Sequence, residues 1–371
     1  MKATIITTVR HNVGDDFIRE GVMHVLEKSL DEPIEYELIH KHMPVSTRHG
    51  FEFIRKYRVS KLVDGVLPLM PASDRVFEAD VLVQSGAPVF WSHPNGPHCA
   101  DNEWFEPLIE RRYRRVAGQV PFFNLAAGSA QQYSSDGSEI LEPFAARDRA
   151  YIQRLMSYTD ALTLRDQVAQ SMLLLLGYNA EVIPCSSIFS AEHMGIRAEE
   201  GEFVAINFMD GGSHFDFSGN ISKDRWLNDF REFYAKVKNQ EKIVFICHDE
   251  KEVKMARLVD PNARIFFSHD YGDYLRMYAQ CKFGIMNRIH GCFGLASLGR
   301  PSFLIGSDSR TLMAREINLP YDYVNNVGTE RLLSEFSTLQ TRWPTYREEM
   351  DEIKRRALAR YRAVLHYGWS R

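Results

Sequence analysis

The sequence predicts an α/β protein built from two parallel, doubly wound sheets that face each other across a cleft. Short runs of β-branched residues alternate with amphipathic helical segments in both halves of the chain, which is typical of parallel sheets covered by helices. The pattern breaks at residues 184–201, where Pro184, Gly195 and a Glu-Glu-Gly run are typical of a linker. A length of 371 residues also suits two domains. We therefore expect one domain over residues 1–190 and another over residues 191–371.

In the first half, the expected elements follow one another in the order that a doubly wound sheet requires. Strands are predicted where apolar residues run together or alternate with polar ones, at 3–8, 34–39, 80–84, 122–127, 161–164 and 180–183. Helices are predicted where apolar residues recur at three- and four-residue spacing, at 17–30, 104–118, 142–158 and 166–176. Residues 41–75 have no regular pattern.

The second half restarts the alternation after the break. Its expected strands lie at 203–208, 242–247, 264–267, 283–286 and 302–305, with helices between them. A long helix is predicted over 346–366, because Met350, Ile353, Ala357 and Tyr361 fall on one face. Ligands of such sheets bind beyond the carboxyl ends of the strands. The loops that follow strands, facing a cleft between two domains, are therefore where functional residues are expected.

The composition argues against several classes of protein. With 45 Lys and Arg against 49 Asp and Glu, the net charge of −4 argues against a general binder of nucleic acid or anionic membranes. No apolar run approaches the roughly 20 residues of a membrane-spanning helix. The five cysteines are odd in number and none lies two or three residues from another, which fits neither a disulfide framework nor a zinc site. We therefore expect a cytoplasmic protein without a metal site.

The loop after the first strand contains Asn12, Gly14, Asp15 and Asp16. Gly14 permits a close approach of a ligand, and Asp15 or Asp16 would cap the helix that follows. The helix N-terminus offers free backbone amides to an anion. Taken alone, the loop is better explained as an ordinary turn and cap.

The loop after the third strand begins at Ser85-Gly86 and continues through Phe90, Trp91, His93 and His98. Such a long loop favours a functional role. The two aromatic rings would stack on a sugar or pack locally. No carboxylate or cysteine lies at a metal-binding spacing from the histidines, so we expect these side chains to be exposed to solvent rather than to bind a metal.

Two further strand ends contain cationic residues. Arg165 follows the strand at 161–164, where it would bind a carboxylate or phosphate, or else form a salt bridge with Asp166. Asn287, Arg288 and His290 follow the strand at 283–286 and precede a helix of small residues. A fixed cation and a titratable imidazole at a helix N-terminus suit an anionic substrate and proton transfer. We favour a functional role for this last group.

The motifs together resemble the polysaccharide pyruvyl transferase family. They are Asn12-x-Gly14-Asp15, Ser85-Gly86, Leu164-Arg165-Asp166, Asn287-Arg288-x-His290-Gly291, Gly299-x-Pro301 and the loop from Ser307 to Arg310. The resemblance implies a GT-B-like fold of two Rossmann-like domains, with a terminal helix that crosses back to the first. This sequence departs from the family in having Ser85-Gly86 for Gly-Gly, Pro184-Cys185-Ser186 for an Asp-containing turn, and arginine rather than lysine at 310.

The resemblance also implies a reaction, in which a pyruvyl group passes from phosphoenolpyruvate to a sugar, forming a cyclic ketal and releasing phosphate. On this basis, Arg288, Arg165 and Arg310 would hold the carboxylate and phosphate. His290 would transfer a proton, with Asp15 as a second base or as an orienting group. The other substrate-binding candidates are Asn12, Gly14, Gly86, Trp91 and Asn287. We therefore expect a cleft that is locally basic although the whole chain is not.

Two other functions remain open at this stage. One is a glycosyltransferase that uses a nucleotide-sugar on the same architecture. The other is a non-catalytic member of a glycan-assembly complex. The acceptor would be nucleotide-linked, lipid-linked or an oligosaccharide of a cell-envelope glycan, and a lipid-linked acceptor would bring the protein to the inner face of the membrane. Neither the acceptor nor the formation of a homo-oligomer can be derived from the sequence.

Overall fold

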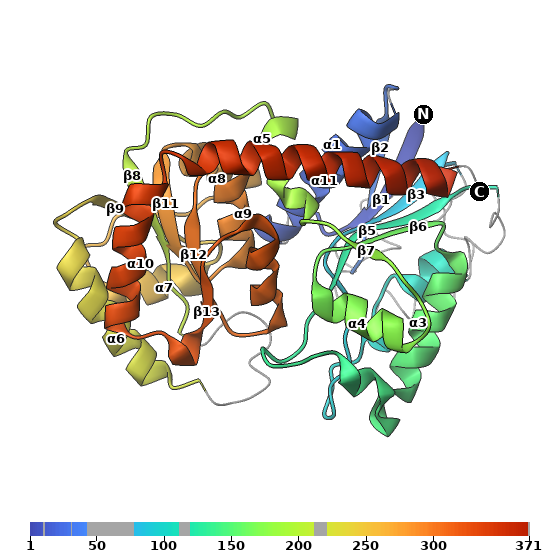
Figure 1. Ribbon diagram of the computed structural model, residues 1–371, viewed down its shortest axis with the longest axis horizontal. Helices are drawn as coiled ribbons and strands as arrows, with labels where there is room; N and C mark the ends of the chain where they lie inside the picture. Colours follow the sequence, from blue (N-terminus) through green and yellow to red (C-terminus); the bar gives the residue numbers. More distant parts are fainter. Residues whose placement is uncertain (10–11, 31, 43–77, 111–118, 211–220, 370–371) are drawn as a thin grey trace.

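The computed structural model describes residues 1–9, 12–30, 32–42, 78–110, 119–210 and 221–369. Two parallel sheets, each flanked by helices, lie side by side, and the last helix extends across both (Figure 1). This arrangement confirms the predicted fold class. Of the helix expected over 104–118, the described part is a π-helix, Phe105–Glu110, and residues 111–118 lie outside the described part.

The first sheet has the strand order β2-β1-β3-β5-β6-β7, with the short β4 beside β5, and its strands are parallel. The strands are β1 (Lys2–Thr7), β2 (Glu35–His40), β3 (Val81–Ser85), β4 (Pro88–Phe90), β5 (Phe122–Ser129), β6 (Ala161–Leu164) and β7 (Glu181–Val182). The chain passes from β1 to β2 on one side and then returns to β3 on the other. The loops after β1 and β3 therefore diverge and leave a crevice at the carboxyl edge.

The second sheet repeats this plan with the order β10-β9-β8-β11-β12-β13. Its strands are β8 (Phe203–Asn207), β9 (Lys242–Ile246), β10 (Ile265–Phe266), β11 (Cys281–Met286), β12 (Ser302–Gly306) and β13 (Tyr321–Tyr323). Here the order reverses between β8 and β11, so the loops after these two strands border the second crevice.

The helices cover both faces of the sheets. They are α1 (Val13–Leu30), α3 (Ala146–Tyr158), α4 (Gln167–Leu175), α5 (Ser190–His193), α6 (Lys223–Val237), α7 (Glu250–Val259), α8 (Tyr271–Ala279), α9 (Ile289–Ser297), α10 (Thr329–Arg342) and α11 (Tyr346–Trp369). Short 3-10 segments occur at Cys99–Asp101, Ser138–Leu141, Pro143–Ala145, Ser186–Phe189, Ser309–Ile317 and Val324–Asn326. Within the described chain, no helix is long and apolar enough to cross a membrane.

Helices α1 and α9 join the two domains through one apolar core. Phe17 on α1 and Phe293 on α9 are fully buried in the same cluster. A Cβ atom on Gly294 would lie only 3.0 Å from the Phe17 ring. The close packing of these two helices brings their N-termini, and the loops before them, to the same place.

The chain crosses from the first sheet to the second through residues 184–201, which are more ordered than the linker expected there. They include the 3-10 turn Ser186–Phe189 and the single turn α5, and both pack against α1. Ser186 donates a hydrogen bond of 3.0 Å to the Ile18 carbonyl. A Cβ atom on Gly21 would lie 1.8 Å from the Ser186 carbonyl oxygen. A glycine in α1 is therefore needed for this contact.

Helix α11 leaves the second domain and packs on α1 and β6 of the first (Figure 1). Tyr346, at its start, donates a hydrogen bond of 2.8 Å to the Ile317 carbonyl in the second domain. Tyr361, three-fifths of the way along, donates a 3.0 Å bond to the Pro184 carbonyl, and the ring of Trp369 lies 5.6 Å from that of Phe123. This helix therefore fixes the position of one domain on the other.

A second set of contacts bridges the loops after β5 and β12. The Gln131 amide donates to the Ser309 hydroxyl, and the Ser309 amide donates to the Gln131 carbonyl, each at 3.0 Å. Close by, the rings of Tyr133 and Tyr323 stack with their centroids 4.8 Å apart. The two domains therefore touch across the carboxyl edges of their sheets as well as along α11.

Candidate active site

The N-terminus of α9 is the centre of the candidate site. Strand β11 ends at Met286, and Arg288 takes the N-cap position with an extended backbone and no capping side-chain hydrogen bond. The backbone amides of the first turn, at Ile289, His290 and Gly291, have no acceptor within the helix. Open amides and the helix dipole together favour an anion at this position.

His290, from the second domain, lies directly against α1 of the first. A Cβ atom on Gly14 would lie 2.5 Å from His290 Nδ1, so only glycine admits the ring here. His290 Nε2 lies 3.5 Å from Nη1 of Arg165, and because a guanidinium only donates, Nε2 is the unprotonated nitrogen. Burial, with the positive charge of Arg165 acting in the same direction, lowers the pKa of His290 to about 3. The imidazole is therefore neutral at pH 7.

Arg165 is a fully buried cation that lacks an ion-pair partner among the described residues. Its exposed fraction is 0%, and neither Nε nor Nη2 has a hydrogen-bond partner. Gly128 on β5 makes room for the side chain, since a Cβ atom there would lie 2.4 Å from Arg165 Nε. The alternative salt bridge to Asp166 does not form, because Asp166 caps α4 through the Ala169 amide at 2.8 Å. Burial of an unpaired cation costs free energy, and a bound anion would offset that cost.

Asp15 lies in the first turn of α1, close to the imidazole. Its carboxylate accepts a hydrogen bond of 2.9 Å from Thr8 Oγ1 and lies 3.6 Å from Lys41 Nζ. Burial alone would raise the pKa of Asp15, but the Lys41 charge, the neighbouring His290 and the Thr8 hydrogen bond bring it to about 2. Asp15 is therefore ionised at neutral pH, and its negative charge acts on the imidazole beside it.

Arg288 is held by two carboxylates of the second domain. Its Nη2 donates to Asp249 at 2.6 Å, and its Nε donates to Glu252. Its backbone amide donates to Asn207 Oδ1 at 3.0 Å. The charge expected to bind an anion is thus already balanced by acidic side chains. Arg288 lines the site, but it differs from Arg165 in having its own counter-ions.

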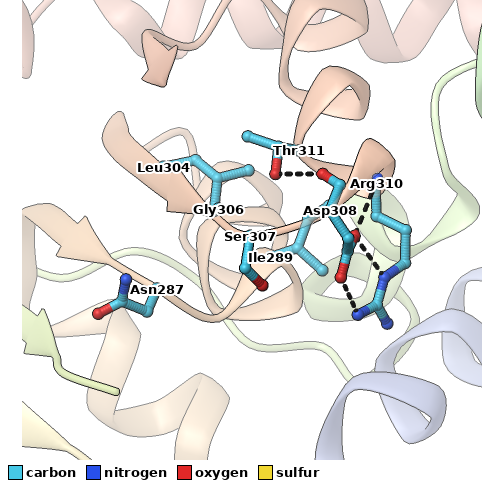
Figure 2. Close-up of a pocket in the computed structure, with 8 residues that line it drawn as sticks. All are labelled: Asn287, Ile289, Leu304, Gly306, Ser307, Asp308, Arg310 and Thr311. Atoms are coloured by element: carbon cyan, nitrogen blue, oxygen red, sulfur yellow. Dashed lines mark hydrogen bonds and ion pairs between the residues drawn. The ribbon is translucent and has the colours of Figure 1, made fainter. Parts of the chain in front are cut away.

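Arg310 is held in the same way. Its Nε donates a 2.9 Å hydrogen bond to Asp308 Oδ1, and its Nη2 donates a 2.5 Å bond to Asp308 Oδ2. Figure 2 shows the guanidinium turned toward this carboxylate, with Thr311 hydrogen-bonded to the Asp308 carbonyl. Asn287, in the same pocket, bridges three strands: its Oδ1 accepts from the Met209 amide at 3.0 Å and its Nδ2 donates to the Ile305 carbonyl at 2.9 Å.

Two adjoining pockets open at this edge. The interdomain pocket, of about 340 Å³, is lined from the first domain by Asn12 and Gly14 and from the second by Arg288, Ile289, Arg310, His248 and His290. The β12 pocket, of about 230 Å³, shares Ile289 and Arg310 with it and extends over Asn287 and the loop from Gly306 to Thr311 (Figure 2). Residues far apart in the sequence therefore form one continuous space.

Not every expected residue lines these pockets, and Arg165 and Asp15 lie behind their walls rather than on them. Asn12 caps α1, with its Oδ1 accepting from the Gly14 amide at 3.0 Å, which corrects the expectation that Asp15 or Asp16 is the cap. Gly86 has φ +54, and a Cβ atom there would lie 2.1 Å from Ile18, so this glycine serves packing against α1. Neither pocket is lined by Gly86 or by Trp91, which is partly buried against the apolar core of the first domain.

The loop after β4 is more buried than expected. Phe90 is fully buried in the core, so its ring is not available to stack on a sugar. The histidines expected at the surface are also partnered: His93 Nε2 lies 2.9 Å from the Ala130 carbonyl, and His98 Nδ1 lies 2.8 Å from buried Asp148. Among the described residues, no group of three or more histidines, cysteines or acids could hold a metal ion.

Sequence reasoning missed the acidic side chains that organise the cations. Glu252 lies in the first turn of α7, within the acidic run that starts at Asp249, and Asp308 follows β12, but nothing in the sequence pairs either with a particular cation. Only the spatial pairing with Arg288 and Arg310 gives them a role. The sequence did contain one signal for these acidic residues, because they follow strands that end close to the expected site.

Replacing Gly14 with alanine should lower catalytic turnover by about 10²-fold, because a displacement of a reacting group by about 1 Å has effects of this size. The new methyl group would occupy the position of His290 Nδ1. The matched control is Gly272→Ala in α8. Gly272 is also the second helical residue, with its amide on the capping side chain, but its Cβ would meet the ends of side chains, those of Met194 at 2.9 Å, Asp270 at 3.1 Å and Arg276 at 3.3 Å. Equal turnover in the two variants, measured with thermal unfolding for each, would contradict the proposed His290 placement.

Comparison with solved structures identifies the fold of the chain. The chain is similar to the S. aureus MnaA–UDP structure, with a TM-score of 0.54, 12% identity, and coverage of 94% of this chain and 91% of that one. It is similar to the UDP-GlcNAc 2-epimerase from Neisseria meningitidis bound to UDP-GlcNAc, with a TM-score of 0.52, 11% identity and 94% coverage of both chains. At these identities the likeness shows the fold alone, which is GT-B-like.

Sequence comparison is more specific. No curated protein matches the chain. The family model described as polysaccharide pyruvyl transferase matches residues 12–309, from the cap of α1 to the loop after β12. This range includes every residue that lines the interdomain pocket except Arg310, which follows the matched range directly. The chain therefore belongs to the polysaccharide pyruvyl transferase family, a family of enzymes.

Proposed function

We propose that this protein transfers the pyruvyl group of phosphoenolpyruvate to a sugar, forming a cyclic ketal and releasing phosphate. The single observation that carries the proposal is the buried Arg165 guanidinium, with two unpartnered nitrogens, beside the neutral imidazole of His290. The family membership supports the same reaction class. Phosphoenolpyruvate is a substrate in this scheme, and no cofactor is required.

The charges of the site favour a particular placement of the donor. We assign an anionic group of phosphoenolpyruvate to Arg165 and to the backbone amides at the start of α9. Nε and Nη2 of Arg165 have no hydrogen-bond acceptor among the described residues, and the amides of the first helical turn have none within the helix. Arg288 and Arg310 are paired with carboxylates, so they contribute orientation more than net charge. The negative net charge of the whole chain is thus compatible with a local anion site.

The proton balance assigns a role to His290. Ketal formation uses two sugar hydroxyls, whose two protons must end on the methylene carbon and on the departing phosphate. A neutral imidazole can accept the proton of the attacking hydroxyl. The ionised carboxylate of Asp15 then stabilises the imidazolium, since the negative charge of Asp15 raises the pKa of His290 against the effect of burial. The imidazolium can return that proton to the methylene carbon.

For the acceptor, we propose a sugar of a cell-envelope glycan or its precursor. Two of the similar structures hold UDP or UDP-GlcNAc, which supports a nucleotide-linked form alongside lipid-linked and oligosaccharide forms. The β12 pocket adjoins the donor site, and we assign the acceptor to that side. All five cysteines are free and buried, in keeping with the cytoplasmic location that we propose, with docking at the inner face of the membrane for a lipid-linked acceptor.

The direct test mixes the protein with phosphoenolpyruvate and a panel of activated sugars, and follows phosphate release and the mass of the sugar product. We expect release that depends on both the acceptor and the protein, with a ketal-bearing product. Release without a modified sugar would indicate hydrolysis instead. No turnover and no binding of phosphoenolpyruvate would overturn the proposal.

A glycosyltransferase is the alternative, favoured by the nucleotide-bound structures of the same fold. Thermal unfolding with each ligand separates the two functions, because a ligand that binds only the folded state raises its stability. Stabilisation by phosphoenolpyruvate and not by a nucleoside diphosphate supports the pyruvyl transferase. The reverse result supports the glycosyltransferase.

A further inference from the structure

His248 is an imidazole in the interdomain pocket to which the proposed reaction assigns no role. It lies between β9 and α7, and its ring lines the pocket together with Gly14 and His290. Its backbone amide donates a hydrogen bond of 2.7 Å to Glu252. The same carboxylate accepts from Asn207 Nδ2 at 2.7 Å and from Arg288. The position of His248 is therefore fixed by the group that also holds a cation of the site.

The ring orientation of His248 is fixed by a buried phenol. His248 Nε2 lies 2.8 Å from the hydroxyl of Tyr278, which is fully buried below α9. Within the described chain this nitrogen is the only partner of the hydroxyl, and a buried hydroxyl must donate to an acceptor. Burial raises the pKa of Tyr278 far above its ordinary value and lowers the pKa of His248 well below its own, so both groups are neutral.

This pair determines which nitrogen of His248 carries the proton. If the Tyr278 hydroxyl donates to Nε2, then the neutral ring has its proton on Nδ1. Among the described residues, Nδ1 has no hydrogen-bond partner, and His248 is one of the residues that line the pocket in which the anion site lies. A fixed donor thus remains available to a ligand.

We propose that Nδ1–H of His248 donates a hydrogen bond to an anionic oxygen of the ligand in the interdomain pocket, and that Tyr278 is the positioning residue that fixes this tautomer. The inference rests on the proposed function for the identity of the ligand as phosphoenolpyruvate. The site would then contain two imidazoles with different roles. His248 binds the ligand through Nδ1, and His290 transfers the proton through Nε2.

Two nearly isosteric substitutions separate the two ring nitrogens. The amide of His248→Asn occupies the position of Nδ1, so it keeps a donor toward the pocket and loses the Tyr278 contact. The amide of His248→Gln reaches the position of Nε2, so it keeps the Tyr278 contact and loses the donor. Calorimetry with phosphoenolpyruvate should show a Kd about tenfold or more weaker for the glutamine variant, as expected for a lost hydrogen bond to a charged group. The asparagine variant should stay within about threefold of wild type.

The opposite order would show that His248 acts only through Tyr278, and equal losses would show general damage to the pocket; both results overturn the proposal. Inorganic phosphate, as a second probe, separates this inference from the reaction. If wild type binds phosphate but does not turn over phosphoenolpyruvate, the proposed function fails and the contrast between the two variants still decides the role of His248. If wild type binds neither anion, both proposals fail.

Discussion

Replacing Arg165 with methionine is expected to reduce phosphate release from phosphoenolpyruvate by about 10³-fold, at the upper end of what the loss of one charge-stabilising donor produces. The same change should leave the free protein at least as stable as wild type. Arg165 is fully buried, and two of its nitrogens have no partner in the described chain. Methionine has a similar length and no charge. The substitution therefore removes the free-energy cost of burying an unpaired cation and removes no ion pair.

The two effects point in opposite directions, which makes the prediction specific. A residue that only supports the fold would lose stability and activity together. The matched control is Arg300→Met, which removes another buried arginine at the start of β12, the end opposite the pocket. Arg300 donates to the Glu199 carbonyl and lies 5.1 Å from the Trp343 ring centre. We expect that variant to be less stable and fully active. Thermal unfolding and steady-state kinetics on both variants provide the test, and full activity of Arg165→Met would remove it from the site.

Replacing His290 with alanine is expected to lower turnover by about 10³-fold, within the usual range for the loss of a proton-transfer group. The ring is placed between Gly14 and Arg165, and its Nε2, which faces Arg165, is unprotonated. The matched control is His269→Ala, which removes an exposed imidazole in the loop after β10. If both variants keep full turnover, the proton is transferred by another group.

The pH dependence tests the same residue. The pKa of His290 is about 3, against an ordinary value of 6.5, because the ring is buried and Arg165 lies beside it. The free enzyme should therefore show no inflection from this imidazole near pH 6.5 in a profile of kcat/KM. In the unfolded chain, His290 is protonated below about pH 6.5, whereas in the folded chain it is protonated only near pH 3. Between these two pH values the unfolded state binds more protons, so His290 lowers the free energy of unfolding as the pH falls from 6.5 to 3. His290→Ala should lose less stability than wild type between these values, as measured by denaturant unfolding at each pH.

The sequence predicted which candidate residues lie close together because of a property of parallel sheets. Residues that follow different strands meet at one edge, so Asn12, Arg165 and His290 could be placed together from strand positions alone. The fold class followed from the same alternation of strands and helices. The short strands β4 and β13 were not predicted, because three residues are too few to show a period.

What the sequence did not reveal was the pairing of side chains. The pattern marks Arg288, Arg165 and Arg310 equally as cations at strand ends. The structure gives Arg288 and Arg310 carboxylate partners and leaves Arg165 without one. Such pairing depends on side-chain reach between neighbouring loops, which no local pattern contains. Similarly, Asn12 and Asp15 are both good capping residues, and the choice between them depends on the residue at which α1 begins.

The path of α11 has a consequence for the order in which the protein folds. Tyr361 and Leu365 are fully buried against the first domain, and a Cβ atom on Gly368 would lie 2.6 Å from Ala161 of β6. These residues leave the ribosome only after the entire second domain has been synthesised. The first domain therefore keeps an apolar surface uncovered while the second half of the chain is synthesised, a state in which nascent chains are prone to aggregate. The final step of folding is then the docking of the last helix on the first sheet.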